Sequence, residues 1–132
     1  MIDYVRTVLL GSSTITNVVG DDVFIEEAIQ AKNPPYIVLD LDGGNPSETK
    51  MAASQLDYYN IAVSCYSTTP YTKSGGAVGA FNISELVRSL LDFHSSGNYF
   101  IYATDLQSNY SVSQGNQPLF CTEQEYIIEK RR

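Results

Sequence analysis

The sequence is poor in the residues that most often carry chemistry, since it has no tryptophan, one histidine and two cysteines. The cysteines, Cys65 and Cys121, are too far apart in the chain for a C-x-x-C metal or redox pair. We expect both to be reduced, small hydrophobic residues buried on strands. No metal site and no cofactor are predicted.

Basic residues are also scarce, with 8 lysines and arginines against 15 acids and a net charge of −7. Binding to nucleic-acid phosphates or to an anionic membrane requires a basic surface, so the composition argues against both. No stretch approaches the roughly 18 apolar residues of a membrane span. The apolar run at residues 8–10 is too short for a signal peptide, and we expect synthesis in a cytosol and no membrane partner.

The composition that remains is that of a folded domain. The chain has 132 residues, of which 43% are hydrophobic and 17% are charged. A chain of this size buries roughly two thirds of its unfolded surface. We therefore predict a single domain over residues 1–132.

Apolar residues at three- and four-residue spacing predict helices over 2–10, from Ser13 to about residue 20, and over about 77–93. Ser13 is the expected N-cap of the second helix. Asn82 and Glu85 have the spacing of a capping box in the third helix.

Dense or alternating β-branched and aromatic residues predict five strands, over 23–25, 36–39, 56–67, 99–103 and 119–129. Residues 42–55 have the composition of a turn followed by a polar connection, and residues 108–117 that of a long loop or an edge hairpin. The order of helix, strands, helix and strands predicts an α+β fold. One mostly antiparallel sheet would carry its helices on one face.

Catalysis finds little support in this sequence. His94 is predicted in the last turn of the third helix, where a histidine interacts favourably with the helix dipole. As a general base it would need a nucleophile such as Cys65 or a serine, and no catalytic signature surrounds any of these residues. We predict no enzyme. A hydrolase built on Cys65 and His94 is the alternative, and alanine at either position would then abolish turnover.

Tyrosine is strongly represented, with ten copies. Its ring and hydroxyl suit protein interfaces, and they suit strands equally well. The candidate subunit-interface residues are Tyr58, Tyr66, Tyr71, Tyr110, Arg131 and Arg132.

Acidic residues gather around the short strand at 23–25. They are Asp21, Asp22, Glu26 and Glu27. One interpretation is a solvated rim. The other is a ring or channel surface that meets a basic partner or repels DNA.

The order of the segments resembles a known family. The chain has LLGSS at residues 9–13 and VVGDDVF at 18–24. It then has AIQ followed by PYIVL within 28–39, IAVSCY at 61–66 and VRSLLD at 87–92. This collinear series resembles the tail-completion proteins of tailed double-stranded DNA bacteriophages, which are tail terminators or head–tail joining proteins. Members often carry an arginine where this chain has Asp22, and residues 43–55 and 107–118 fit the family pattern poorly.

The resemblance implies a subunit that assembles with copies of itself into a ring, expected to be a hexamer. The ring would cap the tail tube, end tail growth and offer a surface to the head–tail connector. Its partners would be the tail tube protein and the connector or adaptor protein, while DNA would pass through without specific binding. The protein would be a virion component of the tail or neck, assembled in the host cytoplasm.

Two further alternatives remain open at this point. One is an adaptor ring next to the terminator in the neck. The other is a monomeric α+β module that binds a ligand or peptide in a concave apolar pocket.

Overall fold

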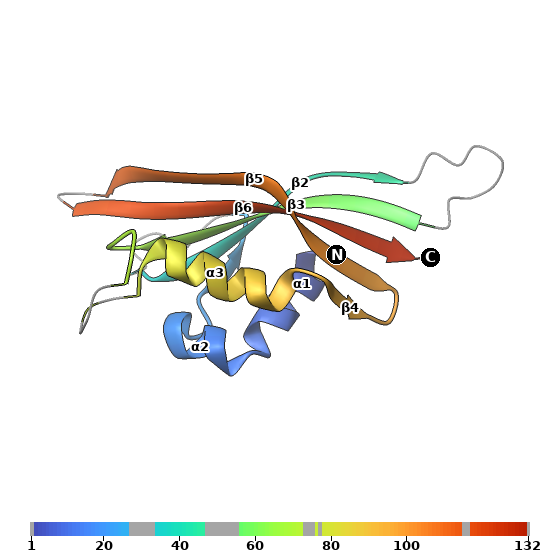
Figure 1. Cartoon of the computed structure of the whole chain (residues 1–132), viewed down its shortest axis with the longest axis horizontal. Helices are drawn as coiled ribbons and strands as arrows, with labels where there is room; N and C mark the ends of the chain where they lie inside the picture. The colour runs from blue at the N-terminus through green and yellow to red at the C-terminus, as the bar shows by residue number, and fades with distance from the viewer. Residues whose placement is uncertain are drawn as a thin grey trace.

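The computed structural model describes residues 2–26, 34–46, 56–72, 76, 78–114 and 117–131. Three helices and six strands follow one another along the chain (Figure 1). The elements are α1 (Ile2–Leu10), α2 (Ser13–Val19), β1 (Val23–Ile25), β2 (Tyr36–Pro46), β3 (Leu56–Ser67), α3 (Ala80–Leu91), β4 (His94–Ser96), β5 (Tyr99–Gln114) and β6 (Gln117–Arg131).

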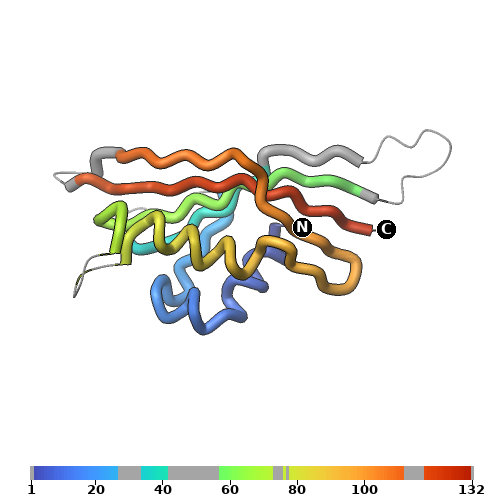
Figure 2. The backbone as a smooth tube through the Cα atoms, in the orientation of Figure 1, coloured from blue at the N-terminus to red at the C-terminus, as the bar shows by residue number. Residues whose placement is uncertain are grey.

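The strands form a single sheet in the order β1-β2-β3-β6-β5-β4. Only β1 and β2 pair in parallel, and all other neighbours are antiparallel. The three helices lie together on one face of this sheet (Figures 1 and 2). The predicted α+β class, with a mostly antiparallel sheet and helices on one face, is confirmed.

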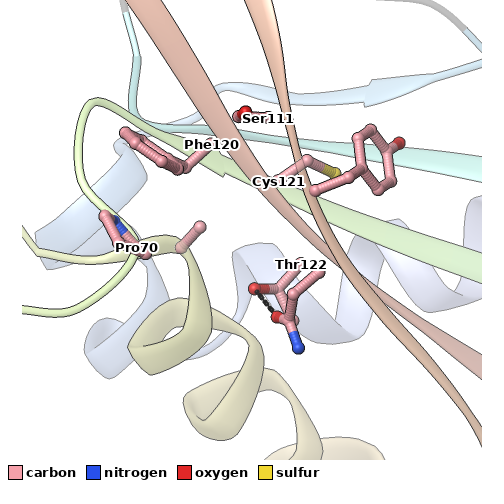
Figure 3. A pocket seen from close by; sticks show the side chains of 8 residues that line it. Pro70, Ser111, Phe120, Cys121 and Thr122 are labelled. Atoms are coloured by element: carbon pink, nitrogen blue, oxygen red, sulfur yellow. Dashed lines mark hydrogen bonds between the residues drawn. The ribbon is translucent and has the colours of Figure 1, made fainter.

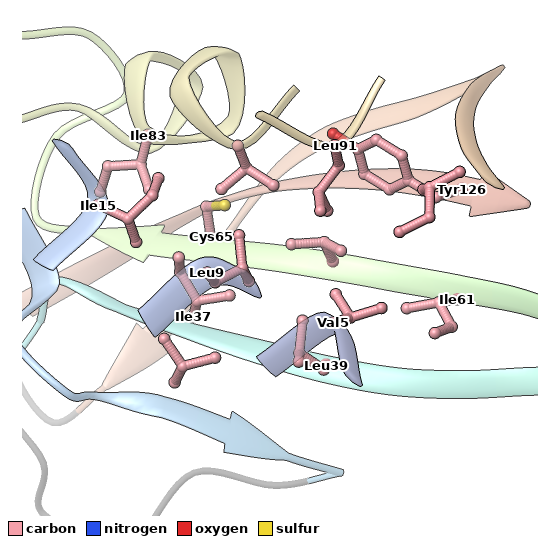
Figure 4. Packing of buried hydrophobic residues seen from close by; sticks show 14 of the residues in the cluster. Val5, Leu9, Ile15, Ile37, Leu39, Ile61, Cys65, Ile83, Leu91 and Tyr126 are labelled. Carbon is pink, nitrogen blue, oxygen red and sulfur yellow. The ribbon is translucent and has the colours of Figure 1, made fainter. Parts of the chain in front are cut away.

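The hydrophobic core fills the space between the helices and the sheet (Figure 4). Its largest fully buried apolar side chains come from all three helices and four strands, and they include Leu9, Ile15, Ile83, Leu91, Ile37, Leu39, Ile61, Ile101 and Ile128. Full burial of one such side chain stabilises the fold by about 1.5–3 kcal/mol. The helical spacing and the strand alternation in the sequence therefore meet in one shared core.

The N-terminal helices begin and end close to where the sequence predicts. Gly11 follows α1, and Gly20 closes α2 with a φ of 63°, a conformation that glycine adopts without strain. The N-cap of α2 is Ser12 and not Ser13 as predicted. Thr16 N donates to the Ser12 carbonyl, so Ser13 is already inside the helix.

The start of α3 differs from the predicted capping box. The N-cap is Gly79, and the Oδ1 atom of Asn82 accepts a hydrogen bond from Thr72 N at 2.8 Å, so Asn82 holds the preceding loop. A Cβ atom on Gly79 would lie 2.4 Å from Tyr71 Cα. Only glycine fits this close approach of two backbone segments.

The end of α3 places His94 differently from the prediction. The helix ends at Leu91, Phe93 turns the chain with a φ of 61°, and His94 is the first residue of β4. The Nε2 atom of His94 and the Oη atom of Tyr4 are hydrogen-bonded at 2.8 Å. His94 therefore links the sheet edge to α1, and the helix-dipole explanation is wrong.

Two strands are much longer than the sequence predicts. β2 continues to Pro46, with a register shift between Leu41 and Gly43, because β3 offers pairing partners along this whole stretch. The turn predicted from residue 42 is wrong up to Pro46, and its remainder, 47–55, lies outside the described residues. β5 runs to Gln114 and pairs with β6, which confirms the hairpin alternative.

Both cysteines are free and buried, on β3 and β6, as predicted. Cys65 is paired in register with Thr122, and Tyr66 with Cys121. Because side chains alternate along a strand, the two thiols lie on opposite faces of the sheet. No helix in the described part of the chain is long and apolar enough to cross a membrane.

Candidate assembly surface

The face of the sheet opposite the helices carries no helix of the described chain (Figures 1 and 2). On β6, Gln124, Tyr126 and Ile128 point to the helices and are buried. The alternate residues Glu123, Glu125 and Glu129 are half-exposed on the other face, and we name them the acidic stripe. The prediction missed this stripe, although the alternation along residues 121–131 could have found it.

Aromatic side chains form a second, smaller cluster on this bare face. The ring of Tyr36 lies 5.0 Å from that of Tyr66 and 6.1 Å from that of Phe24, measured between centroids. Tyr36, Val38 and Leu119 are almost fully buried there, although none of the described helices covers them. One end of the bare face is therefore packed and apolar.

Strand register places Tyr36, Tyr66, Cys121 and Tyr110 in one row across four strands. Burial raises the pKa of Tyr66 to about 12, with the nearby Cys121 thiol as a second cause. Burial also raises the pKa of the Tyr36 and Tyr110 hydroxyls and of the Cys121 thiol. All four groups are therefore neutral at physiological pH.

Three of the predicted interface tyrosines share the bare face. Tyr58 is 37% exposed, Tyr110 is 41% exposed, and Tyr66 is half-buried beside Tyr36. The hydroxyl of Tyr110 donates a hydrogen bond to Glu123 Oε2 at 3.4 Å, which ties the tyrosine row to the acidic stripe. Tyr71 lies apart from them, before α3, with its ring 5.5 Å from that of Phe81.

The predicted acidic patch lies at the β1 edge of the sheet. Asp21 and Asp22 precede β1, Glu26 follows it, and Glu27 lies outside the described residues. The guanidinium of Arg6 reaches the same place, where its Nε atom donates to the Val23 carbonyl at 2.8 Å. This surface is therefore of mixed charge. It lies at the β1 edge and is not part of the acidic stripe, which is on β6.

The predicted basic tip is described only in part. Arg131 ends β6, and its backbone N–H donates to the Asn98 carbonyl at 2.8 Å. Lys130 Nζ lies 5.8 Å from the centre of the Tyr99 ring, a cation–π contact. Arg132 lies outside the described residues.

The candidate catalytic pair is not assembled. Cys65 is buried on β3 and His94 lies on β4, and two strands separate them in the sheet order. Burial raises the pKa of the Cys65 thiol, which disfavours the thiolate that a nucleophile needs. Within the described ranges, no group of three or more metal-ligating side chains is close enough to hold an ion.

A pocket of about 240 Å³ lies between the start of α3 and the β5–β6 hairpin (Figure 3). Pro70, Phe120, Ser111 and Thr122 line it, and Thr122 Oγ1 donates to Asn109 Oδ1 at 2.7 Å. Ligand pockets usually enclose about 300–1,000 Å³. This pocket is below that range, and a second pocket of about 300 Å³, lined by Asn98, Tyr99 and Arg131 among others, lies at its lower limit.

The fold and this surface define a small α+β protein whose sheet, among the described residues, carries helices on one face. The family described as tail completion protein gp17 matches residues 3–115, and the chain belongs to this family. It is thus a structural protein of a bacteriophage-type tail, as the sequence resemblance predicts.

Solved structures support the fold. Fourteen of their chains match significantly. One belongs to a structure described as the virion of a native gene transfer agent particle. It aligns with a TM-score of 0.64 and 12% sequence identity over 97% of this chain and 92% of that chain. A search of curated proteins found no significant match.

Proposed function

We propose that this protein forms a ring, with six copies in the closed form, that caps the tail tube and ends its growth. The observation that carries the proposal is the family match over residues 3–115. The bare sheet face agrees with it, because exposed aromatic residues are typical of surfaces that assemble. The second rim of the ring would receive the connector of the head, and the protein would act without catalysis.

We propose further that DNA passes through the ring unbound. Six copies at −7 each carry −42, and the acidic stripe concentrates part of this charge on one face. Such a surface repels phosphates. The acids Asp21, Asp22, Glu26 and Glu27 would then lie on the ring surface, where Arg131 and Arg132 of a neighbouring copy are suitable partners.

The test is the solution mass by light scattering, with negative-stain images of the same peak and of tail tubes mixed with the protein. Six-fold particles with a central hole, and tubes closed at one end, are expected. A protein that stays monomeric and leaves tube ends open would contradict the proposal. A ring that binds the connector but not the tube would identify the neighbouring neck adaptor instead.

A further inference from the structure

The outer edge of β5 is without a partner strand over most of its length in the described structure. β4 pairs only with Tyr99–Ile101. Asp92 Oδ1 then accepts the backbone N–H of Ala103 at 2.9 Å, and a register shift follows between Ala103 and Gln107. From Gln107 to Gln114 only β6 pairs with the strand. Alternate residues of this stretch direct their N–H and C=O groups outward.

Between Gln107 and Gln114 the sequence lacks the residue types that usually prevent strands from adding, and the register shift lies before this stretch. Its eight residues, QSNYSVSQ, include no charge, no proline and no glycine. Natural edge strands are usually short, charged, interrupted by proline or covered. A long uncharged edge on a protein of net charge −7 is therefore suited to pairing with another strand.

A second open edge lies on the opposite side of the sheet. β1 pairs with β2 only at Ile37–Leu39, and Glu26 N donates to the Leu39 carbonyl. Beyond this point, Asp40–Pro46 has β3 as its one partner strand among the described residues. The stretch contains seven residues, close in length to the eight of the β5 edge. It carries Asp40 and Asp42, has a register shift between Leu41 and Gly43 and ends at Pro46, so an uncharged strand is the partner that avoids like-charge repulsion.

The two open edges also lie at opposite ends of the molecule. The β5–β6 hairpin and the free end of β2 and β3 extend beyond the helices in opposite directions (Figure 1). We propose that the β5 edge at Gln107–Gln114 pairs with the β2 edge at Asp40–Pro46 of a second copy of this chain. Each copy then gives one edge and accepts one, which is the head-to-tail contact that closes into rings. This inference rests on the proposed ring and assigns its subunit contact.

Two cysteine variants on the same face of the sheet test this contact. Leu41→Cys lies on β2 and Ser111→Cys on β5, and both positions are exposed. The variants are mixed, with and without purified tail tubes, and treated with a short thiol-to-thiol cross-linker. Cross-linked dimer is expected in the mixture and not with either variant alone, and the double variant should give a ladder that ends at the ring.

The matched control replaces Ser111→Cys with Ser95→Cys, an exposed position on the β4 edge. The native protein controls for the buried Cys65 and Cys121. Cross-linking of Ser111→Cys with itself would overturn the proposal in favour of two-fold pairing. A six-fold ring without cross-links would overturn the edge contact and leave the ring standing. Absence of any assembly, even on tubes, would overturn both.

Discussion

The two faces of β6 have opposite characters, although they belong to one strand. Ile128 is fully buried against the helices, and its neighbour Ile127 is half-exposed on the bare face. The same contrast separates the buried Gln124 from Glu123 and Glu125. From Glu123 onward, residues of one parity hold the domain together and residues of the other parity are half-exposed, whereas Leu119 and Cys121 near the start of the strand are buried on the bare face.

The largest contrast should come from two adjacent isoleucines. Ile128→Ala removes a fully buried side chain and should lower the free energy of unfolding by about 2–5 kcal/mol. Ile127→Ala should cost much less in the isolated subunit, because this side chain already contacts solvent. Urea unfolding of both variants measures the difference. Equal losses would show that the bare face is part of the core.

Gln124 is a polar residue on the covered face, and its amide supports the β5 irregularity. Its Nε2 atom lies within hydrogen-bond distance of the carbonyls of Thr104 (2.8 Å), Leu106 (3.2 Å) and Glu125 (2.9 Å). Gln124→Leu leaves the carbonyls of Thr104 and Leu106 without that donor, but it also removes the buried Oε1 atom, which has no partner among the described residues, so the net cost should be about 1 kcal/mol of stability.

Hydrogen exchange of residues 107–114 should accelerate in the Gln124→Leu variant, because the hairpin loses its attachment. The exposed Gln107→Leu is the control. Equal protection in both variants would contradict this role.

Alkaline pH should weaken the covered face through its buried thiol. Burial raises the pKa of Cys65, so above its ordinary value of 9.0 the unfolded chain releases a proton that the folded chain keeps. Stability is complete below pH 9 and should fall above it by about 1.4 kcal/mol per pH unit for this group. Cys65→Val should reduce the dependence of the free energy of unfolding on pH, measured between about pH 8 and about pH 10. An unchanged slope would assign the loss to other groups.

The smallest effect on stability should come from the acidic stripe. Replacing Glu123, Glu125 and Glu129 with glutamine should change the free energy of unfolding by about 0.5 kcal/mol or less per site, because all three are half-exposed. Replacing them with lysine should create salt-dependent binding to duplex DNA, measured by fluorescence anisotropy, whereas no binding is expected of the native protein. DNA binding by the native protein would contradict a repelling channel.

The helices and most strands could be predicted because their signals are local. Helical spacing marks α1, α2 and α3, and alternation marks β3. The elements that were not predicted depend on partner strands that are distant in the chain. β2 continues through Gly43 and Gly44 because β3 pairs with them, and His94 joins a strand because β5 lies beside it. Neither partner is visible in the local composition.

The assembly surface was predicted in pieces. The sequence indicated Tyr58, Tyr66 and Tyr110, and register shows that they share one face. It did not separate Tyr71 from them, because that difference depends on where the chain turns before α3. The acidic stripe was not predicted because its members are not neighbours in the sequence, as Asp21 and Asp22 are, and share a face only through the alternation of a strand.

The opposite placement of the two open edges would give the proposed ring two different rims. A ring made by giving one edge and accepting the other has two rims that differ in shape and chemistry, whereas two-fold pairing would make both sides alike. A tube end could then bind one rim, because the other rim would not present the same complementary surface. In the proposed ring, asymmetry of this kind would let a single small protein stop elongation on one side and begin a different attachment on the other.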